Sequence, residues 1–203
     1  MGEVIPNLNT ALDQSDMKGA ITGFPDQIKQ SFSIMNNWTP QNEYNAIQTI
    51  LVLGMGGSAI GGDLARVISQ NSCSVPIIVN RSYNIPGWVN SKTLILASSY
   101  SGGTEETLSA FFQCRERNCP VIVLSTGGKI TELADENGLD RVTIPTGFQP
   151  RAALGFSFSL IILLLNSLKF VHDEVITCVE NSIKPLELLA NELGKAKNAS
   201  LEI

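Results

Sequence analysis

Small polar side chains gather in three glycine-rich segments, which hold the residues best suited to chemistry. The segments are GMGGSAIGGD (54–63), SSYSGGTEET (98–107) and STGGK (125–129). The second places the hydroxyls of Ser99, Ser101 and Thr104 around two glycines, just ahead of an expected helix. A phosphate dianion needs several hydrogen-bond donors, and backbone N–H groups at a helix start, glycines and small hydroxyls together supply them. The second segment therefore predicts a phosphate-binding loop.

Thr104 also fits a different role, because it precedes Glu105 and Glu106 as a helix N-cap precedes an acidic first turn. Capping would explain the Thr104 hydroxyl but would not explain the hydroxyls of Ser99 and Ser101. No G-x-x-x-x-G-K-[ST] sequence is present to hold a triphosphate with magnesium. The expected ligand is therefore a phosphate monoester such as a sugar phosphate.

The first segment matches the dinucleotide-binding pattern G-x-G-x-x-A through Gly54, Gly56 and Ala59. That interpretation expects an Asp or Glu about 20 residues further on, at the end of the next strand. Arg81 follows that strand instead, and it could accept a 2′-phosphate. Asp63 is the nearest acid, and we expect it to be a solvated residue in a helix first turn. Nucleotide binding stays an alternative, while no cofactor and no metal ion are expected.

An arginine stands at the entrance of an otherwise apolar stretch, in FQPRAALG (148–155). Arg151 could cap or solvate a helix start, but a positive charge there opposes the helix dipole. A second role fits better, because a guanidinium can stabilise negative charge that develops on a substrate oxygen. Arg151 is therefore the candidate catalytic residue.

The periodicity of the chain predicts a parallel sheet that brings these segments together. Five short runs are apolar at nearly every position, as strands covered on both faces must be. The expected strands are 49–54, 75–79, 93–98, 120–125 and 141–145. The expected helices are 58–70, 104–117 and 129–137 between strands, and 15–37 (broken near 23–25), 151–170 and 174–197 as flanks. The predicted fold class is α/β, a three-layer sandwich with a five-stranded parallel sheet and helices on both faces, and ligands bind at the carboxyl ends of such strands.

Composition and charge exclude several other classes of protein. The 203 residues are 43% hydrophobic and 16% charged, with a net charge of −5, which allows a buried core but favours neither a nucleic-acid nor a membrane partner. Four cysteines without C-x-x-C spacing and a single histidine indicate neither a zinc site nor a redox pair. The N-terminus lacks the pattern of a signal peptide, and the longest apolar run, 160–165, is too short to cross a bilayer. A cytoplasmic protein is expected.

Four motifs together resemble the sugar isomerase (SIS) fold, and more narrowly the bifunctional phosphoglucose/phosphomannose isomerases. They are GMGGSAIGGDL (54–64), SYSGGTEETL (99–108), STGGKITELA (125–134) and QPRAALG (149–155). The resemblance implies that Gly57 and Ser58 contact the substrate, that the Ser99, Ser101 and Thr104 hydroxyls hold its phosphate, and that Arg151 steadies a cis-enediol(ate) intermediate. It further implies a homodimer that converts glucose 6-phosphate or mannose 6-phosphate to fructose 6-phosphate.

Two departures from the family limit what is expected. Gly103 stands where the family usually has asparagine, so one side-chain amide is missing beside the phosphate. Family members also carry a second SIS domain, which supplies a general-base glutamate and a histidine for ring opening. The expected division is a tail with a helical flank (1–40), a SIS domain (41–171) and a helix leading toward an absent second domain (172–203).

No residue of this sequence is expected to replace that base. His172 is interpreted as a helix-end or surface histidine, and Glu105 and Glu106 stand in a helix first turn, poorly placed to abstract a proton. The sequence therefore predicts phosphosugar binding with poor turnover, and the alternative is a single-domain, non-catalytic phosphosugar-binding regulatory module. The last helix, lacking its partner domain, is expected to expose apolar surface that favours self-association.

Overall fold

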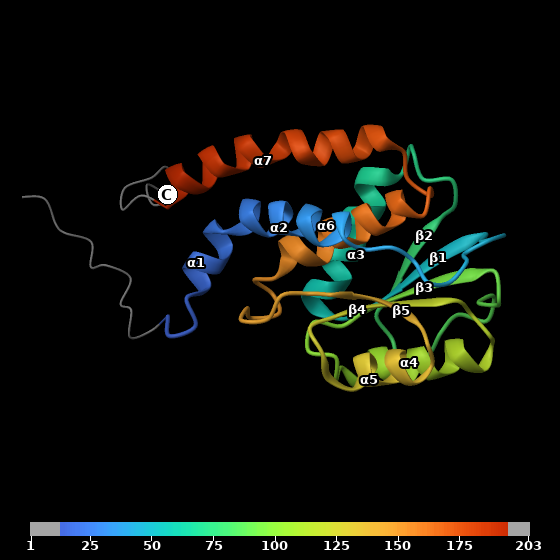
Figure 1. Ribbon diagram of the computed structural model, residues 1–203. Coiled ribbons are helices and arrows are strands. Elements are labelled where there is room, and N and C mark those ends of the chain that lie inside the picture. The colour runs from blue at the N-terminus through green and yellow to red at the C-terminus, as the bar shows by residue number, and fades with distance from the viewer. Residues whose placement is uncertain (1–12, 195–203) are drawn as a thin grey trace, which may run out of the picture.

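The computed structural model describes residues 13–194, which form a parallel sheet covered by helices (Figure 1). The strands are β1 (Thr49–Leu53), β2 (Ile77–Asn80), β3 (Thr93–Ser98), β4 (Val121–Ser125) and β5 (Asp140–Thr143). The helices are α1 (Met17–Thr22), α2 (Phe24–Asn36), α3 (Gly56–Ser69), α4 (Glu105–Glu116), α5 (Gly128–Glu136), α6 (Leu154–Ser167) and α7 (Asp173–Leu193). The described strands pair only in parallel, in the order β2-β1-β3-β4-β5. Residues 1–12 of the predicted tail, and the end of the last predicted helix, lie outside the described residues.

Side chains alternate between the faces of each strand and build a separate core on each side of the sheet. On β1, Ile50 and Val52 join a core covered by α2, α3, α6 and α7, whereas Leu51 and Leu53 join a core covered by α4 and α5. Figure 1 shows α7 outermost, beyond α2 and α6. The predicted three-layer α/β sandwich is confirmed, and α2 and α7 add further cover on one side. Among the described helices, none has the length and apolarity needed to span a membrane.

Two glycines of the first segment allow close helix packing. A Cβ atom on Gly61 would stand 2.7 Å from the carbonyl carbon of Ser157 in α6. A Cβ atom on Gly62 would stand 3.0 Å from Val52 Cγ1 in β1. Without these side chains α3 can lie close to both α6 and the sheet, and this fixes the place of the loop that precedes α3.

A buried carboxylate ties the segment before β1 to β5. Asp140 is 4% exposed and accepts hydrogen bonds from the backbone N–H of Gln41 (2.8 Å), that of Asn42 (3.0 Å) and the hydroxyl of Tyr44 (2.6 Å). Burial alone would raise the pKa of Asp140. The hydrogen bonds lower it, the one from Tyr44 most strongly, and together they outweigh burial and hold the pKa below its usual value. Because Asp140 begins β5, this anchor lies at the amino edge of the sheet.

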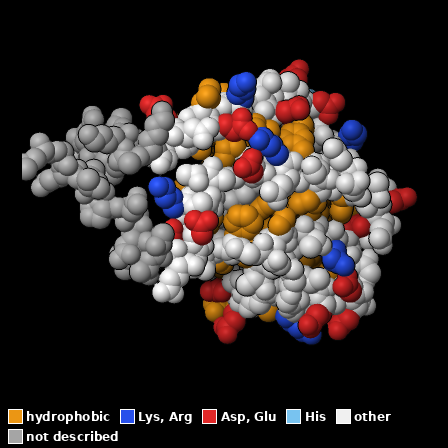
Figure 2. Space-filling view, turned by 60° about the vertical axis from the view of Figure 1, so that its left-hand side comes forward, with side chains coloured by type: hydrophobic (Ala, Val, Ile, Leu, Met, Phe, Trp, Pro, Cys, Tyr) orange, Lys and Arg blue, Asp and Glu red, His pale blue; other side chains and the backbone are white. Residues whose placement is uncertain are grey.

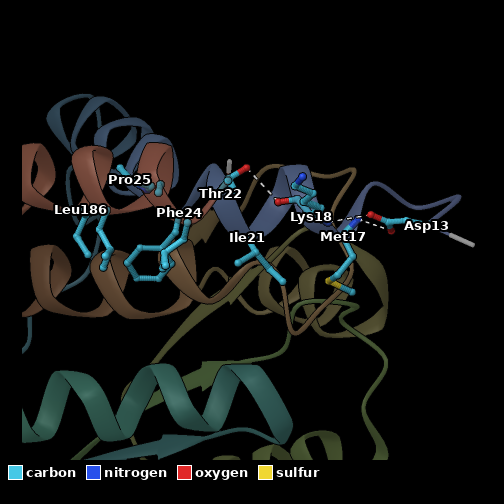
Figure 3. Close-up of a pocket in the computed structure, with 12 residues that line it drawn as sticks. Asp13, Met17, Lys18, Ile21, Thr22, Phe24, Pro25 and Leu186 are labelled. Atoms are coloured by element: carbon cyan, nitrogen blue, oxygen red, sulfur yellow. Dashed lines mark hydrogen bonds between the residues drawn. The ribbon is translucent and has the colours of Figure 1, made fainter. Parts of the chain in front are cut away.

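A groove of about 500 Å³ lies between α1, the start of α2 and α7 (Figure 3). Mostly apolar side chains line it, among them Phe24 of α2 and Leu186 of α7. Ile21 of α1 is 61% exposed, and Leu189 and Leu193 of α7 are 49% and 44% exposed. Figure 2 turns this end of the molecule forward and shows hydrophobic side chains gathered on it. The last helix thus exposes apolar surface as predicted, while self-association stays a prediction.

Candidate active site

The loops after β1 and β3 meet at the carboxyl edge of the sheet. β1 and β3 are neighbours, and the chain leaves β1 into α3 on one face and β3 into α4 on the other. Ligands of open α/β sheets bind where the chain direction switches in this way. Gly54 directly follows β1, and a Cβ atom on it would stand 3.0 Å from the carbonyl oxygen of Ser98, the last residue of β3. The first two glycine-rich segments are therefore in contact.

The loop after β3, residues 99–104 and called the phosphate loop below, is a tight turn that gathers its hydroxyls. The hydroxyl oxygens of Ser99 and Thr104 lie 3.0 Å apart and share a hydrogen bond. Gly102, with a φ of 71°, donates its N–H to the carbonyl oxygen of Ser99 at 3.1 Å and closes the turn. Ser101 is exposed, and its hydroxyl accepts a backbone N–H from two residues on at 3.4 Å. All three predicted hydroxyls thus stand on one turn at the start of α4.

The structure also shows whether Thr104 merely caps α4. Thr104 occupies the N-cap position, but its hydroxyl faces Ser99 and makes no bond to the N–H groups of α4. Two flanking hydroxyls, those of Ser98 and Thr107, are buried and lack a hydrogen-bond partner among the described residues. An unsatisfied buried polar group costs about 1–3 kcal/mol. Side-chain capping therefore does not explain Thr104, and no side chain caps the N–H groups at the start of α4.

The loop after β4 supports the phosphate loop, and its own hydroxyls are engaged in hydrogen bonds within the protein. Ser125 donates its hydroxyl to the carbonyl oxygen of Gly127 at 2.8 Å. Thr126 donates both its hydroxyl (2.8 Å) and its backbone N–H (3.2 Å) to the carbonyl oxygen of Tyr100. A Cβ atom on Gly102 would stand 1.7 Å from the Gly127 carbonyl oxygen, so glycine is required where the two loops touch. The third glycine-rich segment therefore supports the site by packing against the phosphate loop.

The first glycine-rich segment reaches the turn that carries the arginine. α3 begins at Gly56, two residues before its predicted start, so Gly57 and Ser58 form its first turn. Ser58 is 6% exposed, and its hydroxyl has no hydrogen-bond partner within residues 13–194. A Cβ atom on Gly57 would stand 2.7 Å from the carbonyl oxygen of Pro150 and 3.4 Å from Arg151 Cα. The structure therefore brings Gly57 and Arg151 into contact.

Arg151 lies in a turn ahead of α6, residues 148–153, called the arginine turn below. The prediction that the helix starts at Arg151 is wrong by three residues. The carbonyl oxygen of Gln149 accepts the N–H of Ala152 at 2.8 Å and that of the next residue at 3.2 Å, and this closes a separate turn. The guanidinium is exposed and makes no hydrogen bond or ion pair in the described part of the chain. Its charge is therefore available to a ligand.

The other candidate acids and bases stand apart from this cluster. Glu105 and Glu106 occupy the first turn of α4, as predicted. His172 is exposed and is the N-cap residue of α7, which confirms a helix-end histidine. It follows the far end of α6, a helix of 14 residues that spans about 21 Å at 1.5 Å per residue. His172 is therefore remote from the arginine turn.

Asp63 and Arg81 pair with each other. Asp63 was predicted in a first turn, but α3 starts at Gly56 and places it in the helix interior, where it forms an ion pair with Arg81. An arginine engaged in this way is less free to accept a 2′-phosphate. Within residues 13–194, no group of three or more His, Cys, Asp or Glu side chains is arranged to hold a metal ion.

Two residues that the sequence did not single out help to build the site. Gln27 of α2 is 1% exposed and donates its side-chain amide to the carbonyl oxygen of Ala152 at 2.7 Å. Gln27 is a polar residue on the apolar face of an amphipathic helix, and a buried amide there needs hydrogen-bond partners. That position in the sequence could have identified Gln27 as a structural contact. Tyr100 stands inside the phosphate loop but is only 8% exposed. No motif or residue spacing in the sequence indicates that Tyr100 helps to build the site.

Comparison with known proteins places the chain among sugar-phosphate enzymes. No protein-family model matches it. The bifunctional phosphoglucose/phosphomannose isomerase of Caldicellulosiruptor bescii is 42% identical over 82% of this chain and 49% of its own length. That of Aquifex aeolicus is 38% identical over 69% of this chain and 43% of its own length. The crystal structure of a protein from Clostridium difficile 630 matches with a TM-score of 0.66 at 14% identity, over 84% of this chain and 52% of that one.

The chain thus spans about half the length of the curated relatives it matches. Its likeness to the solved structure confirms the fold, and its likeness to the two isomerases agrees with the four motifs. This chain belongs to the SIS-domain phosphosugar isomerase family.

Proposed function

We propose that this chain binds a hexose 6-phosphate at the carboxyl edge of its sheet and supplies part of an aldose-ketose isomerase site. One observation carries the proposal: the Ser99 and Thr104 hydroxyls pair at 3.0 Å at the start of α4 and leave the helix uncapped by a side chain. A helix start with small hydroxyls beside it suits a phosphate dianion. The contact between Gly57 and the arginine turn supports placing Arg151 at the same edge.

The phosphate end of the substrate would accept hydrogen bonds from Ser99, Ser101 and Thr104 and from the first N–H groups of α4. The hydroxyl of Ser58 has no protein partner in the described residues and would face the sugar together with Gly57. These roles follow the family's pattern, and the short distances within the loop support them.

Arg151 would act on the sugar end. Isomerisation through a cis-enediol moves a proton from C2 of the aldose to C1: a base removes it, the electron pair forms the enediolate, and the proton returns to the neighbouring carbon. A guanidinium stays charged throughout and stabilises the enediolate oxygen. Among residues 13–194, the loops at this edge offer no carboxylate suited to the base, since Glu105 and Glu106 belong to the first turn of α4. The base would come from a second SIS domain, as in the family.

The names of the relatives support glucose 6-phosphate and mannose 6-phosphate as substrates. Fructose 6-phosphate, the 2-ketose that both aldoses share as an isomer, would be the product. The division into a flank (1–40), a SIS domain (41–171) and a linking helix (172–203) belongs to the same proposal. So do a homodimeric state and a cytoplasmic location.

A second function, a non-catalytic phosphosugar-binding regulatory module, has one observation in its favour. The phosphate loop and the arginine turn are complete in this chain, whereas the described edge lacks a placed base. A protein of this kind would bind a sugar phosphate and signal its presence without converting it.

Calorimetric titration of the full chain tests the proposal. The three hexose 6-phosphates should bind, while glucose and NADPH should not. Thr104→Val removes one hydroxyl bonded to a charged group and should weaken binding about tenfold. Thr177→Val is the matched control, because the Thr177 hydroxyl bonds only within α7, to the Asp173 carbonyl oxygen at 3.1 Å.

The outcomes separate the alternatives. Stabilisation by NADPH without binding of any hexose 6-phosphate would refute the proposal. Binding without turnover in a coupled isomerase assay agrees with a base supplied from elsewhere or with a regulatory module. Robust turnover of the chain alone, lost in Arg151→Ala, would refute the need for a second domain.

A further inference from the structure

We infer that Tyr100 is a positioning residue that sets the arginine turn at a fixed distance from the phosphate loop. The inference rests on the proposed function, because it assigns the two ends of one ligand to these two segments. Tyr100 lies between Ser99 and Ser101, whose hydroxyls are proposed to bind phosphate. Its own ring points away from solvent, is 8% exposed and belongs to the core on the α6 side of the sheet.

The Tyr100 hydroxyl holds both ends of the loop that leads to the arginine turn. It donates to the carbonyl oxygen of Pro145 at 3.1 Å and accepts the backbone N–H of Phe148 at 3.0 Å. Gly147, with a φ of 98°, turns the chain between these two points. Phe148 is the first residue of the arginine turn, so the hydroxyl fixes where that turn begins.

The rest of Tyr100 holds the loop after β4, so one residue links three strand-end loops. Its carbonyl oxygen accepts two hydrogen bonds from Thr126, at 2.8 and 3.2 Å. The ring of Phe148 in turn packs edge-on against that of Phe156, with centroids 5.5 Å apart, and so joins the arginine turn to the body of α6. A shift at Tyr100 would therefore move Phe148 and the turn that follows it.

Three other contacts hold the arginine turn, and none comes from the phosphate loop. Gly57 packs against Pro150 from the start of α3, and Gln27 of α2 donates to the carbonyl oxygen of Ala152 at 2.7 Å. The side-chain amide of Gln149 donates to the hydroxyl of Ser15 at 3.4 Å. Of these four anchors, Tyr100 alone belongs to the loop proposed to bind phosphate. A ligand that touches both the loop and Arg151 should therefore respond to the Tyr100 hydroxyl, and a ligand that touches only the loop should not.

Two probes and Tyr100→Phe test this in the full chain. Inorganic phosphate reports on the loop alone, and 6-phosphogluconate, which carries a carboxylate at C1, reports on the loop and the arginine together. Tyr100→Phe keeps the ring and should change the Kd of inorganic phosphate less than twofold while weakening 6-phosphogluconate about tenfold. In an Arg151→Ala background, Tyr100→Phe should weaken 6-phosphogluconate no further, because it acts through that arginine.

Tyr44→Phe is the matched control. It removes a partly buried phenolic hydroxyl as Tyr100→Phe does, but this one makes a single hydrogen bond, to Asp140 at 2.6 Å, at the amino edge of the sheet. It should change neither Kd, whereas amide hydrogen exchange at Phe148 should accelerate only in Tyr100→Phe.

Four results would overturn the inference. Equal weakening of both probes would assign Tyr100 to loop integrity, and additive effects with Arg151→Ala would separate it from the arginine. Unchanged 6-phosphogluconate binding in Tyr100→Phe would refute the positioning role while leaving the proposed function intact. If the unaltered chain binds neither probe, the proposed function fails, and the inference fails with it.

Discussion

Replacing Gly57 by alanine is expected to push the start of α3 away from the arginine turn. The new Cβ atom would stand 2.7 Å from the carbonyl oxygen of Pro150 and 3.4 Å from Arg151 Cα. Cβ atoms essentially never approach another heavy atom to under 3.0 Å, and both neighbours are backbone, which cannot rotate aside. One of the two segments must therefore move by a few tenths of an ångström or more.

Two opposing contributions set the size of the effect on stability. Alanine is better than glycine within a helix by up to about 1 kcal/mol, and residue 57 lies in the first turn of α3. Overpacking a tight contact costs about 1–3 kcal/mol. The net loss in the free energy of unfolding is expected to be about 1–2 kcal/mol, which lowers Tm by about 3–6 °C for a chain of this size.

Urea unfolding measures the stability change, and calorimetry with a hexose 6-phosphate measures the change at the site. Gly87→Ala is the control, because a Cβ atom at Gly87 meets nothing within 4 Å, the backbone φ is not positive and the residue lies outside the phosphate loop and the arginine turn. Its stability should stay within about 0.5 kcal/mol of the unaltered chain. If Gly57→Ala matched this control in both stability and affinity, the contact between α3 and the arginine turn could not have the role assigned to it.

Three further perturbations have clear expected outcomes. Hydrogen bonds hold the pKa of Asp140 below its unfolded value of about 3.9, so its carboxylate stabilises the fold above that pH and loses this effect as the pH falls through the folded pKa. Urea unfolding from pH 7 to pH 3 should show a smaller acid loss in Asp140→Asn. Gly103→Asn adds an amide in open space and should tighten phosphosugar binding a few-fold by calorimetry, with little change in stability. Leu189→Asp should reduce self-association measured by light scattering, and a strictly monomeric unaltered chain would contradict that reasoning.

The strands were predictable because strands buried on both faces are apolar at nearly every position. All six residues of β3 are buried, and the sequence run 93–98 matches the strand residue for residue. β5 was placed less well, at 141–145 instead of Asp140–Thr143. It is an edge strand with alternating burial, and it begins at a carboxylate whose burial depends on hydrogen bonds to Gln41, Asn42 and Tyr44. Hydrophobic periodicity does not indicate which residues will form hydrogen bonds with this carboxylate.

The hydroxyls of the phosphate loop were predictable for a different reason, because they stand within six residues of one another and act through local backbone geometry. The corrections at the site all concern where helices begin. α3 starts two residues before its predicted start and α6 three residues after it, so Gly57 and Ser58 lie inside a helix and Arg151 lies outside one. Hydrophobic spacing places a helix face well and its first residue poorly.

The position of Arg151 depends on contacts that no local pattern encodes. The arginine turn is held by Gln27 from 125 residues earlier in the chain and by Tyr100 from 48 residues before Phe148. Gln27 belongs to α2, within the region 1–40 that the sequence assigns to a flank. The buried amide makes that flank part of the site, because it holds the carbonyl group next to the proposed catalytic arginine. An unpaired cation that opposes the dipole of α6 is tolerated since it stands in a separate turn, and α2, the phosphate loop and α3 all contact that turn.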